Sequence, residues 1–275
     1  MGMTYNIGMN RRMAKKLSKK LRFSYFTSRY WLEFLCEHKR KNREHLVYVK
    51  ALDGDNDVLQ YTPSRACNLV GAISLATEEE IKDIESRGID IIEKKEAMRE
   101  YFFKTKDIIE MKGNNHKRNR YAANYFENNY DYRVKYSLDK ETIIHFLKDW
   151  DRKQKLKTLP YQRGLDFCYY ILDQLGNDNN LRAVFVLVED RLVGFSIGER
   201  INSKQWIALH QKVDYNYKGL GRWLFRERAR LFEKTEEFAA GGAMANPGIA
   251  EFKESLYPYR VEPYYSLKLK GESVL

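Results

Sequence analysis

The sequence predicts an α/β (α+β) fold in which mixed, mostly antiparallel sheets are flanked by helices. Both halves of the 275-residue chain mix helical and strand-like patterns. The run LRAVFVLVEDRLVGFSIGERI, at 181–201, indicates two antiparallel strands joined by a turn at 189–191. QWIALHQKV, at 205–213, is a third strand, and a glycine turn then leads into the helical RWLFRERARLFEK, at 222–234.

Earlier segments carry their own start and stop signals. From Arg11 to Arg22 there are seven basic residues and no acid, with apolar residues every four positions. This pattern predicts a basic amphipathic helix that either contacts phosphates or docks one apolar stripe. Thr77, followed by Glu three residues later, is a capping box that opens a helix ending near Gly88. Ser137 or Asp139 caps the next predicted helix, which carries apolar residues on one face.

Charge and composition restrict the partners and the compartment. The formal net charge is +11, which favours an anionic partner such as nucleic acid, an anionic membrane surface or a phosphorylated cofactor, although a plain basic surface gives the same number. The three cysteines form no CxxC pair and the five histidines no HxxxH pair, so reduced thiols in a cytoplasmic protein without a metal are expected. No apolar run reaches the roughly 20 residues of a membrane span, so no transmembrane segment is expected.

A dense basic cluster precedes the second predicted unit. In the segment MKGNNHKRNRYAANYF, at 111–126, basic side chains alternate with asparagines, and three aromatic residues follow on a predicted helix. Basic groups interleaved with aromatic rings can hold a phosphate backbone and stack a base. The same pattern also fits a helix start whose aromatic residues face the core. The basic members are Lys112, His116, Lys117, Arg118 and Arg120, and the aromatic ones are Tyr121, Tyr125 and Phe126.

The glycine turn lies where a strand leads into a helix. Gly219 and Gly221 precede an apolar, helix-like run. The first amides of a helix have no intrahelical partner, and the helix dipole places partial positive charge there, so the location suits a phosphate. The pattern is neither GxGxxG nor a P-loop, and a tight turn without a ligand explains it equally.

The order of two strands, a glycine loop and a helix resembles the core of the GNAT acyltransferase superfamily. The pyrophosphate loop of that superfamily has the pattern Q/R-x-x-G-x-G/A. This sequence matches both glycines and has Asn216 in place of the leading Gln or Arg. The resemblance implies that this loop binds the cofactor through Asn216, Lys218, Gly219, Gly221 and Arg222.

More of the chain is similar to one branch, the family related to the C-terminal domain of phosphatidylglycerol lysyltransferase. That branch has two tandem GNAT-like units, which implies an N-terminal unit at 1–130, with the basic N-terminal helix, and a C-terminal unit at 131–275, with the glycine loop. Four of its motifs have matches in this sequence. They are Lys112-Gly113 followed by Lys117-Arg118-Asn119, Gly194-Phe195 followed by Gly198-Glu199, His210 followed by Lys212, and the segment from Gly248 to Lys253. The sequence departs from the branch at 238–248, where FAAGGAMANPG replaces the usual Asn and acidic residue.

Acyl transfer needs a base, a stabilised oxyanion and a bound leaving group. Glu199 shares one expected strand face with Val193, Phe195 and Ile197, so it is either a partly buried base with a raised pKa or a solvent-exposed partner of a cation. His210 is either a second acid or base or an ordinary strand histidine. The resemblance implies substrate or phosphate binding by Lys112, Lys117, Arg118, Lys212 and Lys253.

The expected function is transfer of an acyl or aminoacyl group to an amine or hydroxyl of a small-molecule or peptide acceptor. The donor is either acyl-CoA, held by the glycine loop, or aminoacyl-tRNA, which the basic cluster and net charge favour. No metal is expected. The alternative is a non-catalytic protein that binds nucleic acid or an anionic surface on a GNAT scaffold.

Overall fold

The computed structural model describes residues 4–6, 28–31, 33–34, 46–50, 57–61, 72–86, 88, 90–154, 159–243 and 246–269. The predicted basic helix at 11–22 lies outside these ranges. The chain divides into two compact units, one of residues 1–100 with 261–275 and one of residues 101–260. The prediction of two GNAT-like halves that meet at residue 130 is a different division and stays a prediction.

The described residues of the first unit form two sets of strands, the helix α3 and a helical stretch at 29–31 and 33–34. The predicted capping box is followed by helix α3, which ends two residues before Gly88, a glycine with φ +74°. The elements are β1 (Thr4–Asn6), β2 (Leu46–Lys50), β3 (Asp57–Tyr61), β4 (Ala72–Ala76), α3 (Glu78–Ser86), β5 (Ile91–Lys104), which continues into the second unit, and β11 (Arg260–Leu269).

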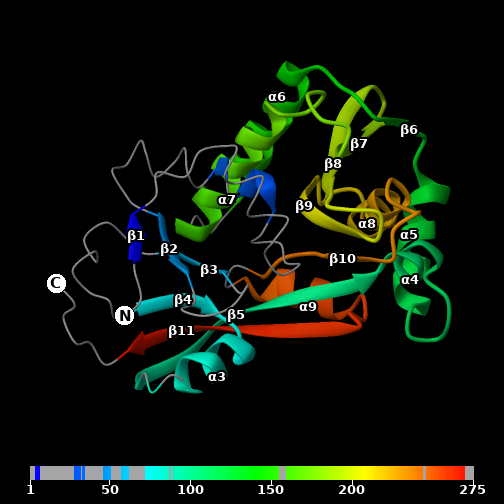
Figure 1. Ribbon diagram of the computed structural model, residues 1–275. Coiled ribbons are helices and arrows are strands. Elements are labelled where there is room, and N and C mark those ends of the chain that lie inside the picture. The colour runs from blue at the N-terminus through cyan, green and yellow to red at the C-terminus, as the bar shows by residue number, and fades with distance from the viewer. Residues whose placement is uncertain are drawn as a thin grey trace. The chain divides into compact units, whose positions relative to one another are not determined.

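The second unit begins within β5 and contains the expected site (Figure 1). Its elements are α4 (Thr105–Glu110), α5 (Lys117–Asn129), β6 (Tyr132–Lys135), α6 (Lys140–Arg152), α7 (Leu159–Leu172), β7 (Leu181–Val188), β8 (Arg191–Arg200), β9 (Gln205–Val213), α8 (Leu220–Arg230), β10 (Glu237–Ala239) and α9 (Pro247–Glu254). Helix α8 begins two residues earlier than the sequence indicated, so Gly221 belongs to its first turn.

Local chemistry explains the best-predicted elements. Glu189 and Asp190 both have positive φ, the geometry of the two-residue turns that join twisted antiparallel strands, and they connect β7 to β8. Of the two predicted caps, Asp139 is the N-cap of α6, and its carboxylate accepts a hydrogen bond of 2.8 Å from the amide of Thr142.

Among the described strands, eight form one mixed, mostly antiparallel sheet in the order β4-β11-β5-β10-β9-β8-β7-β6, and β1, β2 and β3 form a separate small sheet. Strands β9 and β10 run parallel, whereas β10 is antiparallel to β5. The expectation of one such sheet in each of two tandem units is therefore wrong. The 14-residue β5 belongs to this single sheet, and periodicity along the chain does not reveal such long-range pairing.

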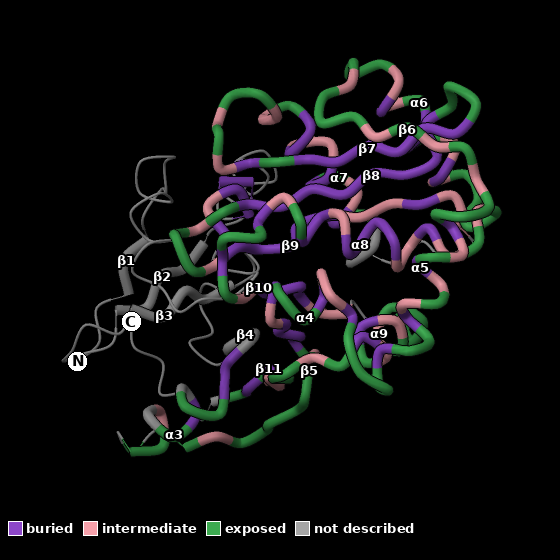
Figure 2. The backbone as a smooth tube through the Cα atoms, turned by 90° about the vertical axis from the view of Figure 1, so that its right-hand side faces the viewer, coloured by how far each residue is buried: buried purple, intermediate pink, exposed green. Residues whose placement is uncertain are grey.

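Strands β7, β8 and β9 are buried on both faces, as the purple tube of Figure 2 shows. Phe195 of β8 contacts Phe146 of α6 edge to face, at 5.9 Å between ring centres. A Cβ atom on Gly194 would lie 3.3 Å from Leu220 of α8. Because adjacent strand residues point to opposite faces, α6 and α8 cover opposite faces of these strands.

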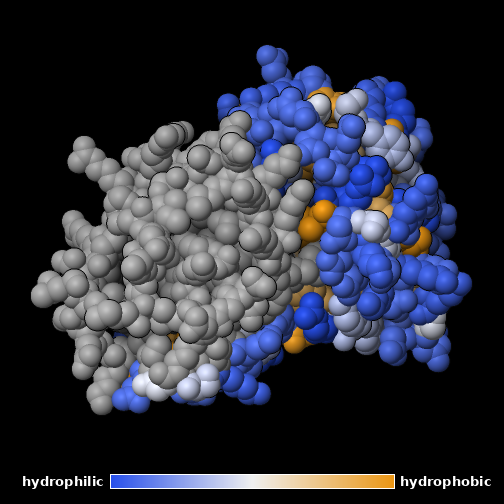
Figure 3. Space-filling view, in the orientation of Figure 1, coloured by the Kyte–Doolittle hydropathy of each residue, from blue (hydrophilic) through white to orange (hydrophobic). Residues whose placement is uncertain are grey.

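The surface of the described part of the second unit is mostly hydrophilic on the face shown in Figure 3. Within the described ranges, no helix is long and apolar enough to cross a bilayer. The same ranges contain no group of three or more His, Cys, Asp or Glu side chains placed to hold a metal ion.

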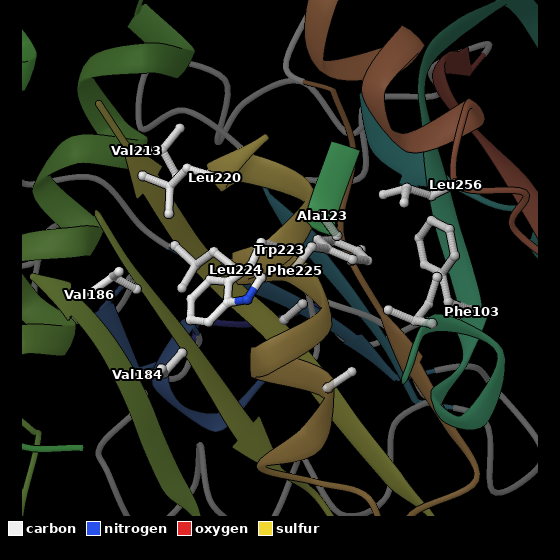
Figure 4. Close-up of a cluster of buried hydrophobic side chains, with 14 of the residues drawn as sticks. Phe103, Ala123, Val184, Val186, Val213, Leu220, Trp223, Leu224, Phe225 and Leu256 are labelled. Carbon is white, nitrogen blue, oxygen red and sulfur yellow. The ribbon is translucent and has the colours of Figure 1, made fainter. Parts of the chain in front are cut away.

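The main core lies between α8 and the sheet, with α5 closing one end (Figure 4). Leu220, Trp223 and Leu224 recur at helical spacing on α8, and all three are buried. Phe126 of α5 packs against Trp223, with 5.2 Å between ring centres. The interpretation that the aromatic residues after the basic cluster face the core is thus correct for Phe126 but wrong for Tyr121, which is 65% exposed.

Candidate functional site

Glu199 lies near the end of β8, opposite Leu181 of β7 and Ile207 of β9. Only 4% of the residue is exposed, so the interpretation that it lies beyond the strand in solvent is wrong. Of the three apolar residues expected on the same strand face as Glu199, Val193 lies on the other face. Val193 is the extra residue of a bulge in β8, opposite the step from Val186 to Leu187 of β7, and it packs in the core on the α8 side. The catalytic role of Glu199 stays a prediction.

A second bulge decides where His210 and Lys212 point. Strand β8 pairs Ile197 with His210 and Gly198 with Ala208, so Leu209 is the extra residue. In a regular strand His210 would share the face of Ala208, which packs in the core under α8. The extra residue reverses the alternation, and His210 and Lys212 therefore point to the opposite face, toward α6 and α7.

His210 is enclosed by apolar groups and cations. Its ring lies 5.0 Å from that of Phe167 of α7, and the residue is 7% exposed. Burial, with smaller contributions from Lys212 and Arg228, holds the pKa of His210 well below its usual value, so the imidazole is neutral at pH 7. Its Nε2 atom is buried and has no hydrogen-bond partner among the described residues.

Lys212 extends over Trp150 of α6, with 4.1 Å between Nζ and the ring centre. Burial lowers the pKa of Lys212, and the neighbouring Cys168 and Asp151 oppose that shift. Cys168 is itself fully buried, and burial raises its pKa to about 12. A thiol in that state stays protonated and is a poor nucleophile, so among the predicted residues the candidates on this face are Glu199, His210 and Lys212.

The glycine loop is shaped by helix packing. Gly219 is the N-cap of α8 with φ +87°, and a Cβ atom there would lie 2.0 Å from the carbonyl oxygen of Ala122 in α5. No side chain fits this position, because the contact is with backbone that cannot move aside. A Cβ atom on Gly221 would meet only Phe252, at 3.8 Å. The close approach of two helices therefore explains Gly219 without a ligand.

Arg222 of α8 joins three helices. Its Nε donates to Oδ1 of Asn119 in α5 at 2.7 Å, and its Nη2 donates to Oγ of Ser255, just after α9, at 2.9 Å. Asn119 also donates to the carbonyl of Ser255 at 2.6 Å. Burial and the nearby Arg118 lower the pKa of Arg222. The guanidinium predicted to bind a cofactor is thus engaged within the protein.

Asn216 and Lys218 lie on the exposed loop before α8. The amide of Asn216 donates to Asp214 at 3.1 Å, and Lys218 Nζ lies 4.6 Å from the ring centre of Tyr125. Asn216 also lines a cavity of about 460 Å³ between α6 and this loop. The five predicted cofactor residues therefore share one end of α8 without converging on one point, and their cofactor role stays a prediction.

Lys253 of α9 holds the end of β10. Its Nζ donates to the carbonyl oxygens of Ala240, Gly241 and Gly242 at 2.6, 2.9 and 2.8 Å. Strand β10 pairs in parallel with β9 through Ala239. The residue is 9% exposed, so its ammonium group lies in the interior, holding a Gly/Ala-rich segment that lacks polar side chains of its own.

The basic cluster forms a cavity of about 620 Å³ at the N-terminal end of α5, which we call the α5 pocket. Lys117 and Arg118 line it, whereas Lys112 lies outside its lining, 79% exposed and paired with Glu110 at 3.2 Å. Tyr257 also lines the pocket, although its place in the sequence suggested packing against the terminal strands. The full lining is Asn114, Asn115, Lys117, Arg118, Arg120, Tyr121, Asn124 and Tyr257.

The predicted residues thus fall into separate groups. Glu199, His210 and Lys212 share the α6 and α7 face of the sheet. Lys117 and Arg118 lie in the α5 pocket. Asn119, the next residue of α5, bonds to Arg222 and so connects this end of α5 to α8. Sequence reasoning missed Asn119 and Ser255 as the partners of Arg222, because their roles depend on three helices meeting.

Comparison with known proteins places this arrangement in a family. The family model described as phosphatidylglycerol lysyltransferase, C-terminal, matches residues 60–267, more than half of the chain. None of the curated proteins matches the sequence.

Solved structures share the fold at low identity. A conserved protein of unknown function from Bacteroides thetaiotaomicron VPI-5482 is 17% identical with a TM-score of 0.71, covering 98% of this chain and 100% of that one. FemX is 9% identical with a TM-score of 0.60, covering 97% and 96%. L-PGS from Bacillus licheniformis is 16% identical with a TM-score of 0.52, covering 83% and 82%. The GNAT-like fold implied by the sequence is thereby confirmed.

Proposed function

This chain belongs to the phosphatidylglycerol lysyltransferase C-terminal family, and from that premise we propose that it transfers an aminoacyl group from aminoacyl-tRNA to an amine or hydroxyl acceptor. The family description refers to transfer of a lysyl group, an aminoacyl group. The acceptor is a small molecule or a peptide. The observation that carries the choice of donor is the α5 pocket, whose charged lining residues are all basic.

Two features favour a tRNA donor over acyl-CoA. The chain has a formal charge of +11, and tRNA binding depends on many phosphate contacts. The helix end expected to receive the CoA pyrophosphate is packed against α5 at Gly219, and its arginine is bonded to Asn119 and Ser255. A phosphate group at that end would have to compete with these contacts.

Glu199 is the proposed base. Its carboxylate accepts the proton of the acceptor as the new amide or ester bond forms, and the ester bond to the tRNA breaks, leaving a ribose hydroxyl that takes up a proton. His210 is neutral at pH 7 because burial lowers its pKa, so its proposed contribution is to donate its ring N–H to a neighbouring group. Both side chains are held rigidly by the sheet, which suits positioned proton transfer.

The test uses a tRNA pool charged with radiolabelled amino acids and measures transfer of label to acceptors in a low-molecular-weight extract. Glu199→Gln should lower the transfer rate by about 100-fold or more, because a general base contributes on that scale, while leaving tRNA affinity unchanged. The matched control is Glu233→Gln, which alters an exposed carboxylate and should behave as the wild type.

The same preparation distinguishes aminoacyl-tRNA from acyl-CoA as the donor. Binding of tRNA should weaken steeply between 50 and about 200 mM salt, as multiple phosphate contacts require. Label transfer from acetyl-CoA with no transfer from charged tRNA would overturn the proposed donor. Thermal stabilisation by CoA alone would point the same way.

One observation favours a second function, a non-catalytic protein that binds nucleic acid or an anionic surface. Glu199 and His210 are both buried, and neither lines the α5 pocket or the cavity beside Asn216. A protein of that kind would bind tRNA in the α5 pocket and show equal, background-level transfer for the wild type and Glu199→Gln.

A further inference from the structure

The α5 pocket has a positive lining without a counter-ion. Lys117 and Arg118 form no ion pair with any described residue, and the lining contains no carboxylate. Arg120 donates to the carbonyl of Met111 at 2.5 Å, which fixes its guanidinium at the same helix end. Uncompensated cations that converge on a cavity are the feature expected of an anion site.

The backbone adds to this charge. Helix α5 is 13 residues long, its first turn holds no acidic residue, and its N-cap, His116, makes no side-chain capping bond. The positive end of the helix dipole therefore faces the same space as Lys117 and Arg118. His116 is 8% exposed, and its Nδ1 is buried without a hydrogen-bond partner among the described residues.

Two tyrosines give the pocket flat apolar surfaces. Tyr121 is 65% exposed and Tyr257 is 51% exposed, both large fractions for aromatic residues. Tyr257 has φ +55°, a strained value for a residue with a bulky side chain, and its ring lies 5.4 Å from that of His116 in an edge-on contact. The fold thus keeps this ring at the pocket despite a backbone penalty.

We propose that the α5 pocket binds the unpaired end of an RNA, with Lys117 and Arg118 on its phosphates and Tyr121 and Tyr257 stacked on its bases. Stacking requires bases whose faces are open, and bases within a duplex are already stacked on one another. At about 620 Å³ the pocket falls in the size range of sites for single small ligands, enough for one or two nucleotides and too small for a duplex.

This inference deepens the proposed function and rests on it, because a charged tRNA carries its amino acid at an unpaired 3′ end. The pocket would then hold nucleotides of that unpaired end, on the side of α5 that Asn119 and Arg222 connect to α8. Direct contact with that end, rather than with the body of the tRNA, makes short single strands sufficient ligands.

The experiment measures fluorescence anisotropy of a labelled six-nucleotide single-stranded RNA and of a blunt RNA hairpin of equal charge, with the full chain. The single strand should bind at least tenfold more tightly than the hairpin. Tyr257→Ala and Tyr121→Ala should each weaken the single strand about tenfold, whereas Tyr257→Phe should bind as the wild type. Arg118→Ala should weaken binding and reduce the log–log salt slope by about 0.7.

Matched controls lie on the same unit outside the pocket. Tyr136→Ala removes a ring that is 68% exposed, and Lys135→Ala removes an exposed charge, so both should leave affinity unchanged. Tyr121 is exposed on a helix surface, so its variant should fold even if substitution of the strained Tyr257 lowers the Tm. Equal affinity for hairpin and single strand, full competition by equimolar adenosine 5′-monophosphate, or indifference of both tyrosine variants would each overturn the proposal.

The assignment of RNA binding to the α5 pocket and the proposed transferase function can be disproved independently. If label transfers from charged tRNA but the pocket variants bind tRNA as the wild type does, the donor is held elsewhere and only the pocket assignment is wrong. If the single strand binds through the tyrosines and no transfer occurs, the pocket assignment is upheld and the transferase function is wrong.

Discussion

At the scale of the residue, Gly219 and Gly221 show how similar sequence positions serve different purposes. Both belong to one motif, yet Gly219 has a positive φ and touches the backbone of Ala122, whereas Gly221 lies in the first turn of α8 with room beside it. The motif predicted the strand-to-helix turn correctly. The close contact with α5, nearly 100 residues away in sequence, could not be predicted, because it depends on tertiary packing.

We predict that Gly219→Ala destabilises the protein by about 3 kcal/mol or more, because it adds a clash with fixed backbone to the strain of a positive φ. Gly221→Ala is the matched control and should lie within about 1 kcal/mol of the wild type, since alanine is the better helix former and its Cβ fits. Urea unfolding measures both. Equal stabilities of the two variants would contradict the assignment of Gly219 to helix packing.

At the scale of the element, a lysine of α9 holds the chain just beyond β10. Lys253 bonds three consecutive carbonyls beyond β10, where β10 no longer pairs with β9. The sequence resemblance marked Lys253 as a substrate or phosphate ligand. Its geometry supports a positioning role within the fold, because its three donors already have three backbone acceptors.

We predict that Lys253→Met lowers the free energy of unfolding by about 3 kcal/mol, since methionine keeps the chain length but leaves buried carbonyls without a donor. Lys135→Met, at an exposed position, should change it by less than about 0.5 kcal/mol. Hydrogen exchange should also become faster in residues 237–243 of the Lys253 variant. Unchanged stability and exchange would instead leave the lysine available for a ligand.

At the scale of the whole molecule, two buried histidines influence how stability depends on pH. Burial lowers the pKa of His210 well below its usual value, and it also lowers that of His116. In the unfolded chain both groups titrate near pH 6.5. Above that pH they are neutral in both states and contribute nothing. Below it the unfolded state binds protons that the folded state does not, so stability falls with decreasing pH.

We therefore predict that stability decreases from pH 6.5 downward, by up to about 1.4 kcal/mol per pH unit for each histidine that stays neutral in the fold. Urea unfolding at pH 7.5 and at pH 5.5 measures the change. His210→Gln should reduce this pH dependence, whereas His145→Gln should not, since His145 is on the exposed side of α6. Equal pH dependence of the two variants would show that His210 is accessible to protons when folded.

The sequence by itself determined the local elements, the net charge and the family. The strand-like apolar runs and the turn within residues 181–213 predict three strands from the sequence alone, and the motif residues identify the family. Only the tertiary structure decided which residues meet. The bulge at Leu209 turned His210 and Lys212 to the α6 and α7 face, β5 joined one sheet, and Tyr257 reached the basic cluster across more than 130 residues of chain. The physical reason is that local pattern reports hydrophobic periodicity, whereas register and long-range contact depend on packing between elements distant in sequence.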